Sequence, residues 1–150
     1  MARRPGLYDF IEHYGTGGGL CRPLFADFLS EAAEALRHPP LAALAERYAE
    51  LGRGWTDLAA AALPDDLAIF RAARELYARK AELLHGGGSA EEIRAIWQQL
   101  ATLEEQARED FPLSDAAYAE LRAQLRTLIA ALYEDEVAAH AAIVQALPER

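Results

Sequence analysis

The sequence predicts an all-α protein, a single-domain bundle of five or six helices with a glycine-rich loop before the second helix. Three observations predict this class. Apolar residues recur at spacings of three and four along six segments, and no segment shows the alternation of a strand. Proline, glycine and serine clusters separate these segments. The 150 residues, 52% of them hydrophobic, can bury one core, so we expect one domain over residues 1–150.

The first half of the chain predicts three helices, over residues 5–13, 23–37 and 41–62. Proline fits the first turn of a helix, where its missing N–H would have no partner, and we therefore start the second helix at Pro23. The stretch "RHPP" ends that helix because a residue before proline is pushed out of helical geometry.

The third of these helices contains two glycines, Gly52 and Gly54, on either side of Arg53. Each glycine weakens a helix interior by about 1 kcal/mol relative to alanine. We expect the pair to mark a kink or a close crossing with another helix, and the sequence suggests no role for Arg53.

The second half of the chain predicts three further helices, over residues 66–84, 90–108 and 115–147. Ser89 and Glu92 have the Ser-x-x-Glu spacing of a capping box. Another serine stands directly before the last helix and suits its N-cap position. The last helix would be about 50 Å long if unbroken. A small bundle rarely covers such a length, so we expect this helix to supply a homodimer or partner interface.

The chain carries a net charge of −9, which argues against nucleic acid as a partner because phosphate binding needs a basic face. The charge is uneven, since residues 1–25 hold three arginines against two acidic residues and the rest is acidic. A small anionic ligand is therefore best placed near residues 1–25, and a cationic one on the remaining surface.

Cysteine use and hydropathy predict a cytoplasmic protein. Cys21 is the only cysteine, so no internal disulfide can form and a reducing compartment is expected. No run approaches the roughly 18 apolar residues of a membrane span. The N-terminal stretch lacks the apolar core of a signal peptide, and we expect no membrane association.

The stretch "EHYGTGGGLCRP" interrupts the helical pattern and is the first candidate site. Consecutive glycines can adopt positive φ and turn several N–H groups into one concavity that suits an anion. A following helix N-terminus and an arginine add positive charge. The candidate ligand-binding residues are Gly15, Thr16, Gly17, Gly18, Gly19 and Arg22. The alternative is structural, a tight helix crossing at which only glycine fits.

The same stretch offers a catalytic alternative. A thiol at a helix N-terminus can be reactive, and a neighbouring histidine can act as its base. Cys21 and His13 are the only such pair nearby, and the glycine loop would then be an oxyanion cradle. The structural alternative is that Cys21 is a small buried apolar side chain.

Glu136 and His140 are four residues apart on one helix face, a spacing that two metal ligands can have. A di-iron bundle needs Glu-x-x-His on two helices together with further glutamates, and the sequence does not contain two such motifs. We therefore expect no metal and no cofactor, and interpret this segment as a solvated acidic turn.

Two adjacent stretches carry a family resemblance: "GTGGGLCRPLFADFLSEAAEAL" and "LAALAERYAELGRGWTDLAAAAL". A glycine-rich run, an arginine, an aromatic residue, "DFL" and "EAA" precede a helix with a tryptophan, and this pattern resembles the butirosin biosynthesis protein H-like family. In that family a cysteine-peptidase-like domain precedes a C-terminal helical domain of unknown function. The resemblance is strongest over residues 7–84 and concerns the helical domain.

The resemblance implies a role in small-molecule or natural-product biosynthesis. The family's named member is an acyltransferase that moves an acyl group from a carrier protein onto an aminoglycoside. This chain resembles the helical domain, so we expect the domain with the nucleophilic cysteine and its histidine to be missing. A larger partner protein that carries a cysteine-peptidase-like domain would supply it.

Together these observations predict a stand-alone accessory or binding module that binds a partner protein or an anionic group at the glycine loop. Two alternatives stay open. In the first, the chain is an acyl or aminoacyl transferase or an amide hydrolase that uses Cys21. In the second, the bundle sequesters a small molecule in an apolar cavity between its helices.

Overall fold

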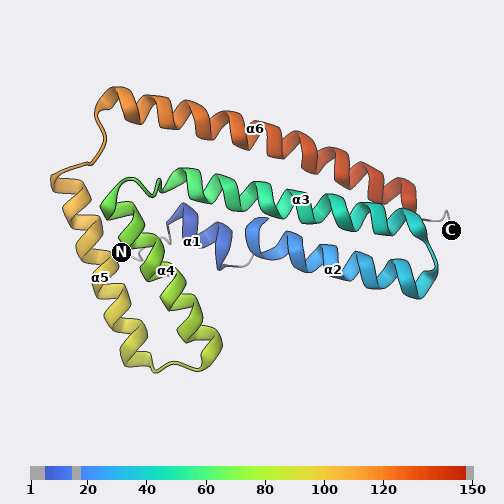
Figure 1. The fold of residues 1–150 in the computed structure, drawn as a ribbon, viewed down its shortest axis with the longest axis horizontal. Coiled ribbons are helices and arrows are strands. Elements are labelled where there is room, and N and C mark those ends of the chain that lie inside the picture. Colours follow the sequence, from blue (N-terminus) through green and yellow to red (C-terminus); the bar gives the residue numbers. More distant parts are fainter. Residues whose placement is uncertain (1–5, 15–17, 148–150) are drawn as a thin grey trace. The chain divides into compact units, whose positions relative to one another are not determined.

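The structure, a computed structural model, describes residues 6–14 and 18–147. These residues form six α-helices and no strand (Figure 1). The helices are α1 (Leu7–Glu12), α2 (Gly18–Leu36), α3 (Pro39–Ala62), α4 (Ala68–Gly86), α5 (Ala90–Glu109) and α6 (Asp115–Ala146). None of these six helices is long and apolar enough to cross a membrane. The predicted all-α class is confirmed, and each of the six predicted segments contains a helix.

The chain divides into two compact units. The first comprises residues 1–59 and 123–150, and it contains α1, α2, most of α3 and the larger part of α6. The second comprises residues 60–122 and contains α4 and α5. The expectation of one domain over residues 1–150 stays a prediction.

The predicted start of α2 is wrong. The helix already contains Gly18, so Pro23 lies inside it rather than in its first turn. The reason is tertiary packing, which overrides the low helix propensity of glycine where a missing Cβ makes room for a neighbour. At Gly18 that neighbour is the indole of Trp55, which a Cβ would overlap.

The core of the first unit lies between α2, α3 and α6. In Figure 1, α2 and α6 run in the same direction and α3 runs in the opposite one. Apolar side chains from all three helices are buried together: Ala26, Leu29, Ala33, Leu41, Leu44, Ala45, Tyr48, Leu51 and Ala139. A second cluster joins Ile11 of α1 to Leu58 and Ala59 of α3 and Leu132 of α6.

Helix α3 approaches both of its neighbours closely at its two glycines. A Cβ at Gly52 would lie 2.8 Å from Cδ of Pro23 on α2, and a Cβ at Gly54 would lie 2.6 Å from Cδ2 of Leu132 on α6. The expectation of a close crossing is confirmed, and α3 continues through both positions. Arg53 points into solvent, with its side chain 68% exposed.

The second unit is built on α4 and α5, which form an antiparallel pair (Figure 1). The predicted capping box begins α5, where Ser89 Oγ accepts a hydrogen bond from the Glu92 N–H at 3.2 Å and Glu92 Oε2 accepts one from the Ser89 N–H at 2.9 Å. The bonds that the Ser89 backbone N–H and hydroxyl donate to this carboxylate hold the pKa of Glu92 below its ordinary value. Lys80 is fully buried in this unit, with its Nζ 4.4 Å from the ring centre of Trp97.

We expect Gly52→Ala to lower the free energy of unfolding by about 1–3 kcal/mol, because the new methyl group meets the rigid ring of Pro23. Gly86→Ala is the matched control, since a Cβ at that helical position meets nothing within 4 Å. Better helix propensity should raise its free energy of unfolding, by up to about 1 kcal/mol. Urea unfolding followed by circular dichroism measures the free energy of unfolding of both variants. A change of the same sign in both variants would contradict the close approach of Pro23 to Gly52.

Candidate functional site

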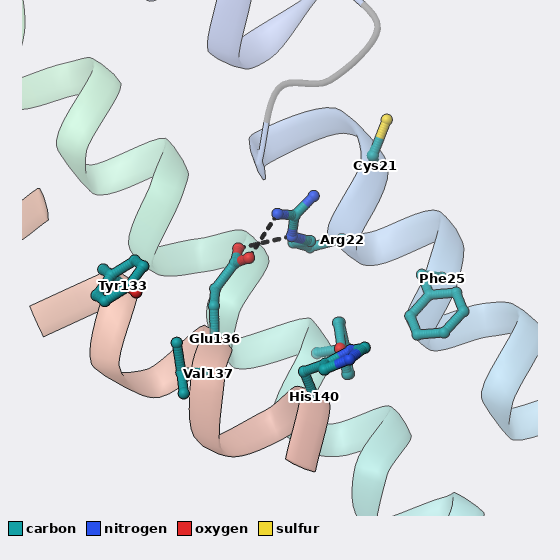
Figure 2. A pocket seen from close by; sticks show the side chains of 8 residues that line it. Cys21, Arg22, Phe25, Tyr133, Glu136, Val137 and His140 are labelled. Carbon is teal, nitrogen blue, oxygen red and sulfur yellow. Dashed lines mark hydrogen bonds and ion pairs between the residues drawn. The ribbon is translucent and has the colours of Figure 1, made fainter. Parts of the chain in front are cut away.

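The structure brings one set of candidate residues together in an open groove between α2 and α6, above α3 (Figure 2). The groove has a volume of about 650 Å³, within the range of roughly 300–1,000 Å³ that is usual for ligand sites. Its walls are residues of α2 and α6, and one residue of α3 lies between them. The lining residues are Cys21, Arg22, Phe25, Tyr48, Tyr133, Glu136, Val137 and His140.

Glu136 is the centre of a cluster of three hydrogen bonds in this groove. Arg22 donates from Nε to Oε1 at 2.7 Å and from Nη2 to Oε2 at 2.6 Å, which is the bidentate geometry of a strong ion pair. Trp55 Nε1 donates to Oε1 at 2.7 Å. A single carboxylate of α6 therefore joins α2 and α3, and Figure 2 shows its bonds to Arg22 in the groove.

These contacts set the charge states in the groove. Burial acts to raise the pKa of Glu136, but the hydrogen bonds from Arg22 and Trp55 outweigh it and hold this pKa below its ordinary value. The hydrogen bond to Glu136 raises the pKa of Arg22. Burial raises the pKa of Tyr48, and the negative charge of Glu136 raises it further. At neutral pH Arg22 and Glu136 are therefore both charged and paired with each other, and the phenol of Tyr48 is neutral.

The predicted glycine-loop site falls only partly within the described residues. Three of its members lie outside them: Gly15, Thr16 and Gly17. Gly18 and Gly19 lie in the first turn of α2, where a Cβ would overlap Trp55 and the carboxylate of Glu12 respectively. The contact with the indole of Trp55 favours the structural alternative for Gly18. Anion binding at the loop stays a prediction, and the guanidinium of Arg22 already binds Glu136.

Of the predicted catalytic pair, His13 lies beside Asp9 and Cys21 lies at the groove. His13 Nδ1 lies 3.1 Å from Oδ1 of Asp9, a fully buried carboxyl one helical turn earlier. Cys21 is half-buried at the groove. Figure 2 shows its sulfur directed away from the Arg22–Glu136 pair. Catalysis by Cys21 with His13 stays a prediction.

The hydrogen bonds that join Glu136 to Arg22 and Trp55 are not predicted from the sequence. The interpretation of Glu136 as part of a solvated acidic turn is wrong, because its side chain is only 25% exposed and is bound by two other helices. Its partner Arg22 is 114 residues away in the chain, and no short-range spacing signals such a pair. In the part of the chain that the structure describes, no group of three or more His, Cys, Asp or Glu side chains could hold a metal.

Comparison with known families gives one match. The model of a domain of unknown function, DUF4872, matches residues 4–111, which is most of the chain. No curated protein and no solved structure is significantly similar to the chain. The expectation of a domain of unknown function is confirmed, and nothing in these comparisons links the chain to the butirosin biosynthesis protein H-like family.

We expect acid to remove part of the protein's stability through Glu136. A carboxyl whose pKa is lower in the folded chain than in the unfolded chain stabilises the fold above its unfolded pKa of about 4.3 and loses this contribution as the pH falls. Because the side chain is partly exposed, the contribution is on the order of 1 kcal/mol. Glu136→Gln should therefore be less stable at pH 7 and show a weaker decline below pH 5.

Urea unfolding between pH 7 and pH 3 measures this difference. Glu50→Gln is the matched control, because the side chain of Glu50 is 72% exposed, and it should retain the wild-type profile. A Glu136→Gln profile that stays parallel to that of the wild type would contradict the ion-pair contribution.

Proposed function

This chain belongs to the DUF4872 family, and on that premise we propose that it is a cytoplasmic accessory module of small-molecule or natural-product biosynthesis that binds a partner protein. The biosynthetic role is supported by the resemblance of residues 7–84 to the butirosin biosynthesis protein H-like family. The binding role is supported by the groove between α2 and α6. We assign the binding surface to this groove rather than to the glycine loop.

The observation that carries the proposal is the exposure of large apolar side chains at the groove. Tyr133 is 68% exposed and Val137 is 52% exposed, and both line it. Neighbouring exposed apolar side chains on a folded protein mark surfaces that another molecule covers. The charged side chains of the groove, Arg22 and Glu136, already bind each other, so we assign recognition to the apolar walls.

A partner protein is better supported than a small anion. The positive charge of Arg22 is balanced by Glu136, and the carboxylate of Glu12 lies against Gly19. An anion at the start of α2 would therefore meet a carboxylate and compete with Glu136 for the arginine. Of the two expected protein partners, a second copy and a larger chain with a cysteine-peptidase-like domain, we favour the larger chain because two copies of charge −9 repel each other.

The enzyme alternative is less well supported than binding. A transferase or hydrolase would need Cys21 as its nucleophile, and its sulfur points away from the charged groups of the groove (Figure 2). The groove is also open to solvent along α6, which suits a docking surface better than a cavity that sequesters a small molecule. The enzyme alternative predicts that Cys21→Ser abolishes activity.

We expect a tagged wild-type chain, purified from its own host's lysate, to appear in native mass spectrometry as a complex with a second, different polypeptide. Val137→Asp should lose that polypeptide, because a charge in the groove wall would have to be buried without a partner. Ala138→Asp is the control: the same charge is placed on the next, exposed residue of α6, which does not line the groove.

Two results would contradict the proposal. A mass that corresponds to the wild-type chain alone would argue against a protein partner. A mass that corresponds to two copies of the chain would identify a homodimer. Equal loss of the second polypeptide in both variants would show that the groove is not its binding surface.

A further inference from the structure

Tyr48 of α3 forms the floor of the groove between α2 and α6. Only 9% of its surface is exposed, and it lines the groove. Its ring packs edge-on against the ring of Phe25, at a centroid distance of 4.7 Å. Among the described residues, no group forms a hydrogen bond with its hydroxyl. The floor of the groove therefore carries a polar atom whose hydrogen-bonding capacity the protein does not use.

A nine-tenths buried hydroxyl without a protein partner is unusual. Buried tyrosine hydroxyls normally form a hydrogen bond, because the loss of water without a replacement costs free energy. Burial, and then the negative charge of Glu136, raise the pKa of Tyr48. The phenol therefore keeps its proton at neutral pH and can donate it in a hydrogen bond. A ligand with an oxygen acceptor would complete this interaction.

The charged side chains of the groove restrict the charge of such a ligand. Among the described lining residues, Arg22 is the only arginine or lysine and Glu136 is the only acidic residue. Two hydrogen bonds, of 2.7 and 2.6 Å, pair these two side chains. An anion would compete with Glu136 for the guanidinium, and a cation would compete with Arg22 for the carboxylate. A neutral ligand leaves the pair intact.

The rest of the lining indicates the body of the ligand. Half of the lining residues carry a ring: Phe25, Tyr48, Tyr133 and His140. Binding sites for small molecules typically combine such rings with a few placed polar groups, and aromatic rings pack well on one another. The volume of about 650 Å³ is sufficient for a drug-sized molecule. The lining therefore favours a ligand with an aromatic ring.

We propose that the floor of the groove binds a neutral aromatic small molecule, whose carbonyl oxygen accepts a hydrogen bond from the hydroxyl of Tyr48. The ring of this molecule lies against Phe25, and the pair of Arg22 and Glu136 stays closed beside it. This inference goes beyond the proposed function, because it concerns the floor of the groove, whereas the partner protein is assigned to its exposed walls.

The test uses the full chain and three soluble probes that each carry one ring: acetophenone, which is neutral and has a carbonyl oxygen, benzoate, which is an anion, and benzylammonium, which is a cation. The chain contains two tryptophans. The indole N–H of Trp55 binds Glu136 and reports on the groove, while Trp97 lies on α5 in the second unit and serves as the internal reference. Titrations followed by the two indole N–H signals in NMR measure each affinity.

We expect acetophenone to shift the signal of Trp55 until it saturates and to leave that of Trp97 in place. The two charged probes should bind at least about fivefold more weakly, because each competes with the ion pair. Tyr48→Phe should weaken acetophenone at least about fivefold, since it removes only the hydroxyl. Tyr118→Phe is the matched control: it makes the same change at an exposed residue of the second unit and should stay within about twofold of the wild type.

The unfolding temperature of Tyr48→Phe tests the starting observation. The substitution removes no hydrogen bond between described residues, so this variant should unfold at the temperature of the wild type or above it. A clearly lower temperature would show that the hydroxyl already has a partner in the free protein, and would overturn the inference.

Three results of the titrations would also overturn it. The absence of a saturable shift with acetophenone would show that the floor binds no ligand of this class. Equal affinities for acetophenone and benzoate would show that the ion pair does not select a neutral ligand. Equal effects of Tyr48→Phe and Tyr118→Phe would place acetophenone away from the hydroxyl.

Discussion

The close approach of α3 to its two neighbours is the constraint on which the first unit depends. Gly52 lets Pro23 of α2 come near, and Gly54 lets Leu132 of α6 come near on another side of the same helix. A side chain at Gly52 would meet the rigid ring of Pro23, and one at Gly54 would meet the end of the Leu132 side chain. Because these side chains pack directly on the backbone of α3, short contacts can link three helices that are far apart in the chain.

The Glu136 cluster is a consequence of this geometry. Trp55 follows Gly54 directly on α3, and its indole N–H and the guanidinium of Arg22 both reach one carboxylate of α6. Without these donors, burial of the Glu136 carboxylate would cost free energy. With them, the carboxylate holds the three helices together. Because Arg22 and Glu136 bind each other, our proposal assigns the recognition of a partner to the apolar residues of the groove walls.

The family match and the groove cover different parts of the chain. The match extends over residues 4–111 and includes α2 and α3. The wall formed by Tyr133, Val137 and His140 lies on α6, beyond the matched residues. The binding surface that we propose therefore combines a helix of the family domain with a helix that the match does not reach, so partner choice has to be examined with α6 present.

Local patterns in the sequence were sufficient for the helices and for several of their ends. The capping box of Ser89 and Glu92 is an interaction between residues three apart, and apolar spacing reports directly on helical periodicity. The sequence also indicated that Gly52 and Gly54 mark something unusual, since glycine is unfavourable inside a helix. In each of these cases the interaction that determines the local structure joins residues that are close in the sequence. A short stretch of sequence is therefore enough to predict it.

Contacts between distant residues required the folded chain. Nothing near Gly18 in the sequence shows that Trp55 occupies the space of its absent Cβ, and nothing near Glu136 points to Arg22. The spacing of Leu24 and Phe28 likewise shows that they share a helix face but not whether a neighbour covers it. Periodicity reports the face on which a side chain lies, whereas burial depends on which other helix packs there. The groove follows from that packing.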